Sequence, residues 1–301
     1  MGALIGLDWG TGTTSAVTFP RELPAADEAW GQPNVETKTL QSDLVRADGQ
    51  NWRLAADGES RDGRLTVLHG LKRLLASSPG DPQAEAYVQA QVLTASHAAG
   101  QLIVEGHPLD EAAMILFRDL QWRVVGRQAA PELIGLAFPG YPASEQLTAI
   151  GETFQSASPA PLILCSEGQA AAAVYSFRGI FEANRRVTFV NVGAGQSWAA
   201  IVYFAAPGAY EILAERGDLW LGGDDLDACL SHLLHEKLDE AGILAQLDPE
   251  QVRPVEARLL AAAEAAKREL GKSAEVEVLL PFLYSGADRR PQHVRLTLHQ
   301  A

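Results

Sequence analysis

One stretch near the N-terminus decides the interpretation of the whole chain: Leu4-Ile5-Gly6-Leu7-Asp8-Trp9-Gly10-Thr11-Gly12-Thr13-Thr14-Ser15-Ala16-Val17. It predicts an apolar strand, a tight turn of small residues and the start of a second strand. Glycine lets the backbone approach a ligand closely, and consecutive N–H groups in such a turn form an anion site. An acidic residue beside that site, here Asp8, could hold a magnesium ion through water. An ordinary hairpin explains the stretch equally well.

Length and composition restrict the class of protein. The 301 residues are 47% hydrophobic and 21% charged, which is typical of a globular chain long enough for two domains. The formal net charge of −14 argues against a non-specific nucleic-acid binder, because phosphate contacts need clustered Lys and Arg.

The sequence also gives expectations about location. No apolar run reaches the roughly 20 residues that span a bilayer, and the N-terminus lacks the basic start of a signal peptide. The two cysteines, Cys165 and Cys229, stand in apolar contexts. We therefore expect buried thiols, a reducing cytoplasmic location and no membrane partner.

The first half of the chain predicts an α/β lobe with an inserted segment. Leucines within 65–75 recur at helical spacing, with Lys72 and Arg73 on the other side of that helix. We assign about 34–104 to the insertion. The expected elements are short strands and turns over 34–63, strands at 86–94 and 101–104, a helix from Leu109, a strand at 133–138, a helix capped by Ser144, a strand at 162–165 and a helix over 169–176. This alternation of strands and helices implies an α/β lobe.

A second glycine turn suggests an internal duplication. Residues 187–192 predict a strand, Gly193-Ala194-Gly195-Gln196 a tight turn, and 197–204 the returning strand. The unit repeats the architecture of 4–18, which suggests a ligand between two halves. We then expect a strand at 210–216, a loop at 217–225, a helix at 226–241, a helix from Asp248-Pro249 to Leu270 with a break near Pro254, and strands at 274–280 and 293–298.

In this order, the motifs resemble the nucleotide-binding domain of the seventy-kilodalton heat-shock chaperone (heat shock protein 70) family, within the actin, sugar-kinase and heat-shock ATPase superfamily. The similar stretches are 5–11, 136–141, 165–172, 189–195, 217–227 and 263–270. Singly the glycine turns are weak signals, whereas the stretches 217–227 and 263–270 are far more specific. The resemblance covers almost the whole chain and implies a bilobal actin-like ATPase fold of duplicated ribonuclease-H-like lobes.

The resemblance implies a division into lobes. Residues 1–178 form lobe I, including the insertion, and 179–301 form a partial lobe II with a subdomain at about 222–301. The family continues beyond the last predicted strand. We therefore expect a divergent, C-terminally incomplete domain with an incomplete second lobe, because of truncation or because a separately encoded part supplies the rest.

The resemblance also implies a site for ATP or ADP with Mg²⁺. In the family the metal lies near the acids matching Asp8 and Glu167, which are the expected catalytic pair and would hold Mg²⁺ through water. The residues implied to bind nucleotide are Gly10, Thr11, Gly12, Thr13 and Thr14, then Gly193, Ala194, Gly195 and Gln196, then Gly222 and Gly223, and finally Glu264, Lys267 and Arg268. A solvated helix face with ordinary ion pairs explains the last three without a ligand.

Departures from the family pattern lead us to expect weak or absent hydrolysis. Asn191 stands where the family has an aspartate, and Gln196 and Trp198 replace a threonine and an aspartate. Counting back from Lys72-Arg73, we place the family's catalytic lysine near Ala55-Ala56, where no lysine lies. The expected function is nucleotide binding in a chaperone-like role, with co-chaperones as further partners. The alternatives are a non-catalytic interaction scaffold and, less favoured, a sugar or acetate kinase relative.

Overall fold

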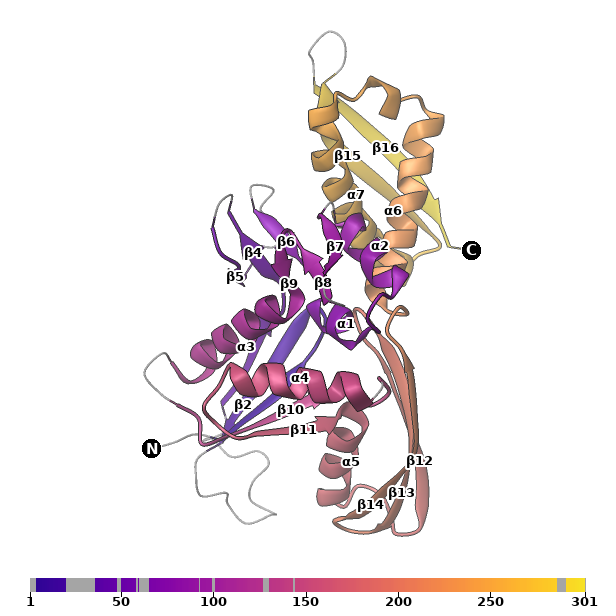
Figure 1. The fold of residues 1–301 in the computed structure, drawn as a ribbon. Helices are drawn as coiled ribbons and strands as arrows, with labels where there is room; N and C mark the ends of the chain where they lie inside the picture. Colours follow the sequence, from indigo (N-terminus) through magenta and orange to yellow (C-terminus); the bar gives the residue numbers. More distant parts are fainter. Residues whose placement is uncertain are drawn as a thin grey trace. The chain divides into compact units, whose positions relative to one another are not determined.

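The computed structural model describes residues 4–19, 36–47, 50–57, 59, 65–91, 93–98, 101–126, 130–142, 144–285 and 291–300. Within the predicted strand-and-turn segment 34–63, positions 34–35, 48–49, 58 and 60–63 therefore lie outside the described residues. The chain divides into two units, Met1–Leu221 and Gly222–Ala301. Each unit mixes helices and strands, as expected for an α/β protein (Figure 1).

A five-stranded sheet in the order β11-β10-β1-β2-β3 organises the first unit (Figure 1). Its strands are β1 (Leu4–Trp9), β2 (Thr13–Phe19), β3 (Glu36–Gln41), β10 (Leu133–Phe138) and β11 (Leu162–Ser166). β10 pairs in parallel with both β1 and β11, whereas β2 pairs antiparallel with β1 and β3. Because side chains alternate along a strand, Ile5, Leu7 and Trp9 all face one buried core. Asp8 therefore lies on the opposite face.

Helices cover the core face of this sheet. α3 (Leu109–Val125) and α4 (Ser144–Ser156) contribute buried residues to the same core as β1. Phe117 of α3 stacks on Phe154 of α4, with ring centroids 4.5 Å apart. The helix predicted from Leu109 is confirmed. α5 (Glu167–Phe177) follows β11 directly, and Ser166 caps it by accepting from Gln169 N–H at 2.9 Å.

The inserted segment forms two small sheets and two helices. One sheet contains β4 (Leu44–Arg46), β5 (Arg53–Leu54) and β6 (Thr66–Leu68), and the other contains β7 (Ala95–Ala98), β8 (Gln101–Val104) and β9 (His107–Pro108). Between them lie α1 (Leu71–Ala76) and α2 (Pro82–Ala90).

Three sequence predictions in this segment need correction. The strand predicted at 86–94 is wrong, because Asp81 caps a helix there by accepting from Gln83 N–H at 2.9 Å and Pro82 suits its first position. The helical pattern over 65–75 divides into β6 and the short helix α1. Residues 36–41, assigned to the insertion, instead form β3 of the main sheet.

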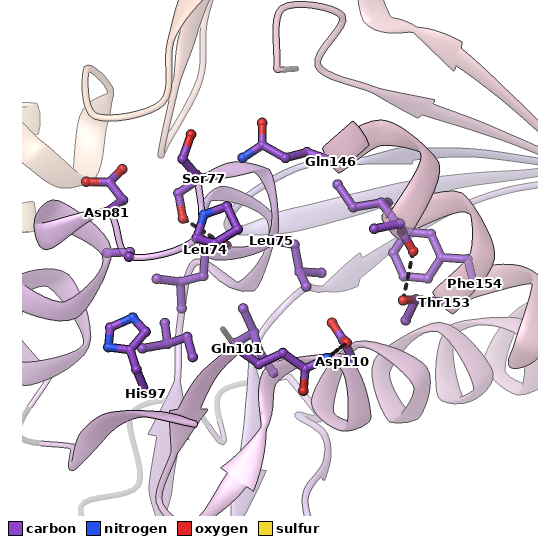
Figure 2. Close-up of a pocket in the computed structure, with 18 residues that line it drawn as sticks. Leu74, Leu75, Ser77, Asp81, His97, Gln101, Asp110, Gln146, Thr153 and Phe154 are labelled. Carbon is purple, nitrogen blue, oxygen red and sulfur yellow. Dashed lines mark hydrogen bonds between the residues drawn. The ribbon is translucent and has the colours of Figure 1, made fainter. Parts of the chain in front are cut away.

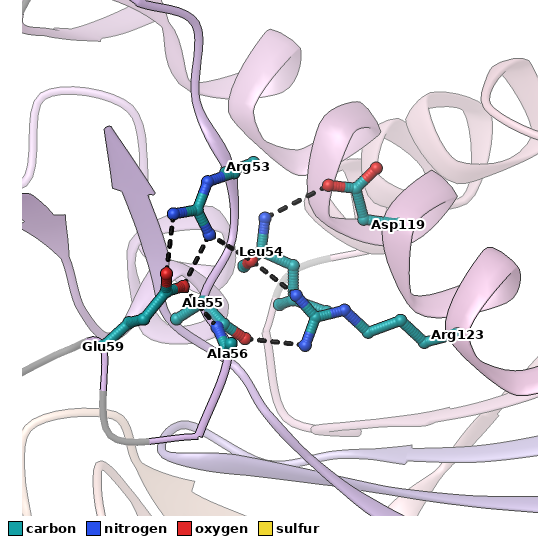
Figure 3. A network of polar contacts seen from close by, with 7 residues as sticks. All are labelled: Arg53, Leu54, Ala55, Ala56, Glu59, Asp119 and Arg123. Atoms are coloured by element: carbon teal, nitrogen blue, oxygen red, sulfur yellow. Dashed lines mark hydrogen bonds and ion pairs between the residues drawn. The ribbon is translucent and has the colours of Figure 1, made fainter. Parts of the chain in front are cut away.

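A polar network fastens the insertion to α3 (Figure 3). Arg123 of α3 donates to the carbonyl oxygens of Leu54 and Ala55 at 2.7 and 2.8 Å, and Asp119 accepts from Leu54 N–H at 3.1 Å. Arg53 pairs with Glu59 at 2.6 Å near the surface. Hydrogen bonds from Arg53 and from the Ala56 N–H lower the pKa of Glu59 to about 2.

A second, antiparallel sheet completes the first unit. It contains β12 (Arg185–Val192), β13 (Ser197–Ala206) and β14 (Ala209–Asp218) in that order. Trp198, Ala200, Val202 and Phe204 alternate onto a buried face that packs with Ala172 of α5. The sheet is therefore attached to the first sheet through α5.

The second unit packs two helices on a two-stranded sheet. Its elements are α6 (Gly223–Glu240), a short 3-10 turn (Leu244–Gln246), α7 (Pro249–Leu270), β15 (Glu275–Ser285) and β16 (Pro291–His299). Leu234, Leu259 and Leu280 lie in its core. α7 continues through Pro254, so the predicted break is wrong.

Two further observations concern surface properties. Cys229 of α6 is exposed and Cys165 is half-buried, so the expectation of buried thiols is wrong for Cys229. Among the residues described, no helix combines the length and the apolar character needed to cross a membrane.

Candidate functional site

Both glycine turns close with the same hydrogen bond. In the first turn, residues 10–13, Gly10 N–H donates to the Thr13 carbonyl oxygen at 3.0 Å. In the second turn, residues 193–196, Gly193 N–H donates to the Gln196 carbonyl oxygen at 2.8 Å. Each turn joins two antiparallel strands, β1 to β2 and β12 to β13. The repetition inferred from sequence thus extends to the hydrogen bonding of the backbone.

The two turns contact each other. A Cβ atom placed on Gly195 would lie 2.3 Å from Cγ2 of Thr11, whose side chain is buried. A Cβ atom placed on Gly12 would lie 3.7 Å from the Cβ of Ala194. Gly195 therefore has to be glycine, because a side chain there would occupy the position of Thr11.

Buried Glu167 lies beside the second turn and begins α5. Its Oε1 accepts from Lys72 Nζ and from Gln196 Nε2, the latter at 2.9 Å, and its Oε2 accepts from Trp198 Nε1. Loss of hydration raises the pKa of Asp8, the charge of Lys72 opposes this rise and the charge of Glu167 adds to it. The charges of Lys72 and Glu167 thus act on Asp8, the other member of the predicted acidic pair.

Lys72 and Arg73 are the site residues that we did not predict. We expected both on the polar side of a helix, but their side chains are only 2% and 0% exposed. We placed the family's catalytic lysine near Ala55-Ala56, where no lysine lies, but Lys72 supplies a cation beside Glu167. The available signal was that a helix between Gly70 and Pro79 is too short to present a separate solvent face.

The surroundings of α1 explain this burial. A cavity of about 190 Å³ lies on one side of α1, lined by its residues Leu74, Leu75 and Ser77 together with α4 residues such as Phe154 (Figure 2). On its rim, Gln101 donates to Asp110 at 2.7 Å. None of the lining residues belongs to either turn. The helix α1 therefore lines this cavity with one side and supplies Lys72 and Arg73 to the turns with another.

Arg73 connects the second turn to the loop that follows β14. Its Nη2 donates to the Gly195 carbonyl oxygen, and its guanidinium lies 4.7 Å from the ring of Tyr87 and 4.8 Å from the ring of Trp220. The indole N–H of Trp220 donates to Asp81 at 3.3 Å. We call Arg73, Tyr87, Trp220 and Asp81 the Arg73 cluster. A stacked arginine of this kind links separate segments through its charge and its flat face.

Tyr141, in the Pro-Gly-Tyr-Pro turn after β10, reaches the second turn as well. Its hydroxyl donates to Gln196 Oε1 at 2.9 Å. A Cβ atom on Gly217 of β14 would lie 2.3 Å from the Tyr141 ring. Burial, together with nearby carboxylates, raises the pKa of Tyr141 above its ordinary value. The buried side chain of Gln196 is thereby held from two directions, by Tyr141 and by Glu167.

A comparison with known protein families matches residues 132–301 to the family described as Hsp70 protein. The chain belongs to the Hsp70 family. The resemblance inferred from sequence is confirmed. Membership makes this an Hsp70-type, chaperone-like nucleotide-binding domain. The matched range contains Glu167, the second turn and the whole second unit, whereas Asp8, the first turn and Lys72 precede it.

The remaining predicted residues of this Hsp70-type chain have varied surroundings. In the first turn region, Thr13 is exposed, whereas buried Thr14 shares a hydrogen bond of 2.8 Å with Ser42. In the second unit, Lys267 donates to Asp227 and to the Gly223 carbonyl oxygen at 2.6 and 2.9 Å.

Three further predicted residues lie in the second unit. Gly222 N–H donates to Asp225 at 2.7 Å. Arg268 pairs with Glu264 one turn away on α7, as the solvated-face interpretation expects. These two contacts each lie within one helix segment, whereas the bonds of Lys267 hold the start of α6 to the C-terminal half of α7. Their role toward a nucleotide stays a prediction.

The acidic residues can be tested for their fit to Mg²⁺. Among the described residues, no group of three His, Cys, Asp or Glu side chains is placed to hold a metal ion. Magnesium usually keeps several waters and binds through one or two carboxylates plus phosphate. Asp8 fits that role, because among the described residues no hydrogen bond or ion pair of its carboxylate competes with a metal-bound water. Glu167 fits it less well, because three donors already bind its oxygens.

Proposed function

We propose that this Hsp70-type domain binds ATP and ADP with Mg²⁺ between its two glycine turns, and that it hydrolyses ATP slowly or not at all. One observation carries the proposal. The two turns have the same backbone hydrogen bond and lie against each other, with Lys72 and Asp8 beside them. Backbone amides and a cation are the groups that bind phosphate in proteins.

Nucleotide binding requires the turns to separate. Thr11 packs against Gly195, and Arg73 holds the Gly195 carbonyl oxygen. Phosphates between the turns would displace these contacts, and the charges of Lys72 and Arg73 would compensate by attracting the anion. Asp8 would hold Mg²⁺ through water, and the metal would neutralise phosphate charge when bound.

Slow hydrolysis follows from the surroundings of Glu167. A general base must accept a proton from the attacking water within hydrogen-bond reach. Lys72, Gln196 and Trp198 already donate to the two carboxylate oxygens of Glu167. A water could bind there only by displacing one of them. Asn191, opposite Trp198 in the β12–β13 pairing, carries no charge that could replace it.

Calorimetric titration with ADP and ATP, with and without Mg²⁺, tests the binding. We expect Mg²⁺-dependent binding of both nucleotides and a phosphate-release rate well below that of an intact chaperone domain. Asp8→Ala should remove the Mg²⁺ dependence, whereas Asp57→Ala, at an exposed aspartate away from the turns, should not. Turnover that matches an intact chaperone domain would contradict the proposal of slow hydrolysis.

A non-catalytic scaffold is the second candidate, and the closed turns favour it. Thr11 packs against Gly195 without a ligand, and Arg73 holds the Gly195 carbonyl oxygen in place while it packs on Tyr87 and Trp220. Under this alternative the same titrations show no heat of binding for ADP or ATP at any Mg²⁺ concentration. That result would replace the nucleotide-binding proposal.

A further inference from the structure

We propose that the cavity beside α1 is a binding site for a small organic cation, an amine attached to one apolar ring. We call it the α1 cavity. All of its lining residues belong to the first unit, and none belongs to either glycine turn. The inference therefore goes beyond the proposed function and does not depend on nucleotide binding.

The buried part of the lining is mostly apolar and comes from separate elements. Leu74 of α1, Leu109 of α3, and Ile150 and Phe154 of α4 line the cavity and belong to the core of the first unit. Ser77 is also buried, but its hydroxyl donates to the Leu74 carbonyl oxygen at 2.7 Å. The cavity thus has a preformed apolar wall, which binds an apolar ring by removing it from water.

The volume of the α1 cavity suits one ring. An apolar cavity of roughly 150 Å³ holds one benzene molecule, and the α1 cavity has a volume of about 190 Å³. The additional volume accommodates a short substituent. A larger apolar body would leave part of its surface in water or displace side chains of a close-packed core. The ligand is therefore a small molecule.

The polar part of the lining favours a positive charge. Of the described residues that line the cavity, Asp81 and Asp110 are carboxylates and none is a lysine or an arginine. His97 also lines it, and Nδ1 of that ring lies 3.7 Å from the carboxylate of Glu85. An ammonium group at this edge is attracted by the carboxylates, whereas an anion is repelled.

Asp110 is the residue that binds the amine in this proposal. It is half-buried near the start of α3, and its Oδ2 accepts from Gln101 Nε2 at 2.7 Å (Figure 2). Among the described residues, its Oδ1 has no hydrogen-bond partner. Asp81, in contrast, uses both oxygens, on the Gln83 N–H and on the Trp220 indole. A carboxylate with one open oxygen beside an apolar wall is complementary to an amine on a ring.

A packing gap filled by water is the competing explanation. The polar residues at its edge would hydrate such a gap. It would then show no preference among small molecules that share one ring and differ in charge. Comparing a cation, a neutral molecule and an anion of the same shape separates the two explanations.

The test is a saturation-transfer NMR titration of the full chain with benzylamine, benzyl alcohol and benzoate. We expect saturable binding that weakens in this order. Asp110→Asn should weaken benzylamine binding by about 2-fold to 5-fold, as for a solvent-exposed ion pair, and leave benzyl alcohol unchanged. Glu111→Gln is the matched control, because it removes the same charge from the next residue of α3, which does not line the cavity. It should leave both affinities unchanged.

A second pair of variants locates the ligand. Ala149 of α4 is exposed and lines the cavity, so a larger side chain there can fill the opening without disturbing the core. We expect Ala149→Trp to weaken benzylamine binding by more than about 10-fold, because filled space leaves no room for the ring. Ala86→Trp, at an exposed alanine of α2 outside the lining, should have no effect. Bound benzylamine should also slow hydrogen exchange of the α1 amides.

The outcomes decide the proposal independently of nucleotide. Benzylamine binding that Asp110→Asn weakens and Ala149→Trp abolishes supports the site. Equal affinities for benzylamine and benzoate, or no saturable binding of benzylamine, overturn it, and so does binding that Ala149→Trp leaves unchanged. Should Ala149→Trp fail to fold, the comparison of Asp110→Asn with Glu111→Gln decides the question. Because no nucleotide enters these titrations, failure of the proposed function leaves this inference in place, and the reverse also holds.

Discussion

The first and second turns can be compared atom by atom, because each closes with a glycine N–H bound to a carbonyl oxygen three residues later. Their side chains have different partners. Around the first turn, Thr14 bonds to Ser42 and the His69–Asp43 pair lies alongside. In the second turn, Gln196 bonds to Glu167 and Tyr141.

The comparison shows that the backbone determines the conformation of each turn, whereas side chains determine the chemistry around it. Hairpin pairing and glycine are enough to produce the same turn twice. The chemistry near each turn depends on residues that come from elsewhere in the chain. In the second turn these residues satisfy one another, because Gln196 and Trp198 donate to the carboxylate of Glu167. Beside the first turn, the side chain of His69 bonds to Asp43 and keeps 31% of its surface exposed.

The largest loss of stability is expected from removing Lys72, the cation that binds Glu167 beside the second turn. Lys72→Ala leaves Glu167 buried without its ion-pair partner, which typically costs about 3–5 kcal/mol of unfolding free energy. Urea unfolding followed by tryptophan fluorescence measures the loss. All six tryptophans precede residue 221, so the signal reports the first unit.

Arg185→Ala provides the control for this measurement. Arg185 pairs with Glu182 in the same unit, but both side chains are more than 60% exposed. The loss of such a surface pair should stay below about 1 kcal/mol. Equal losses for Lys72→Ala and Arg185→Ala would show that the buried pair does not stabilise the site.

Replacing one glycine by alanine in each turn should destabilise the two turns by different amounts. The Cβ atom of Gly10→Ala would lie 2.3 Å from the Thr13 carbonyl oxygen, whereas that of Gly193→Ala would lie 3.3 Å from the Gln196 carbonyl oxygen. Backbone atoms cannot move away cheaply, so we expect Gly10→Ala to lose about 1–3 kcal/mol and Gly193→Ala less than about 1 kcal/mol. The same urea titration checks both, and a larger loss for Gly193→Ala would contradict the geometry.

One hydrogen bond can be removed beside each turn for a finer comparison. Tyr141→Phe removes the 2.9 Å bond to Gln196, and Thr14→Val removes the 2.8 Å bond to Ser42. Each variant should lose about 1 kcal/mol, because both bonds are neutral, the Thr14 bond being buried and the Tyr141 bond partly buried. Thermal unfolding of the two variants side by side measures the losses. A loss confined to Tyr141→Phe would mean that the second turn alone depends on its side-chain partners.

The smallest change in stability is expected from substituting Glu59, which belongs to neither turn. Its pKa is lowered from 4.5 to about 2 by Arg53, so the charged form is favoured in the folded state. The pair therefore stabilises the protein above about pH 4.5, and this contribution is lost as the pH falls toward about 2. Glu59→Gln should be slightly less stable than the unmodified chain near neutral pH and equally stable at about pH 2. A difference that is constant with pH would contradict the assignment.

Much of the fold could be predicted because its signals are local. The buried strand at 133–138 and the apolar stripe of α3 each show their pattern within one element. The membership in the Hsp70 family was also predictable from the order of the motifs. The structure of residues 86–94 was not predictable, because Tyr87 and Val88 favour strands and the deciding cap, Asp81, lies before them.

The candidate site was less predictable because its contacts are long-range. Lysine and arginine are almost never fully buried unless they are paired, and the partners of Lys72 and Arg73 are 95 and 122 residues away. No local sequence pattern indicates partners that are this far away in the chain. The charge of Glu167 acts on Asp8, and the metal-binding and catalytic roles of both residues stay predictions. The division into lobes at 178/179 stays a prediction too.

The Arg73 cluster has a consequence for how the chain folds. It joins Arg73 to Gly195 across 122 residues and Asp81 to Trp220 across 139 residues. Each glycine turn, in contrast, closes over three residues. Closing a long loop costs more entropy than closing a short one, so the hairpins form first and the cluster forms later. During synthesis, Trp220 has to leave the ribosome before the cluster can close, and until then Arg73 lacks its contact with the Trp220 ring.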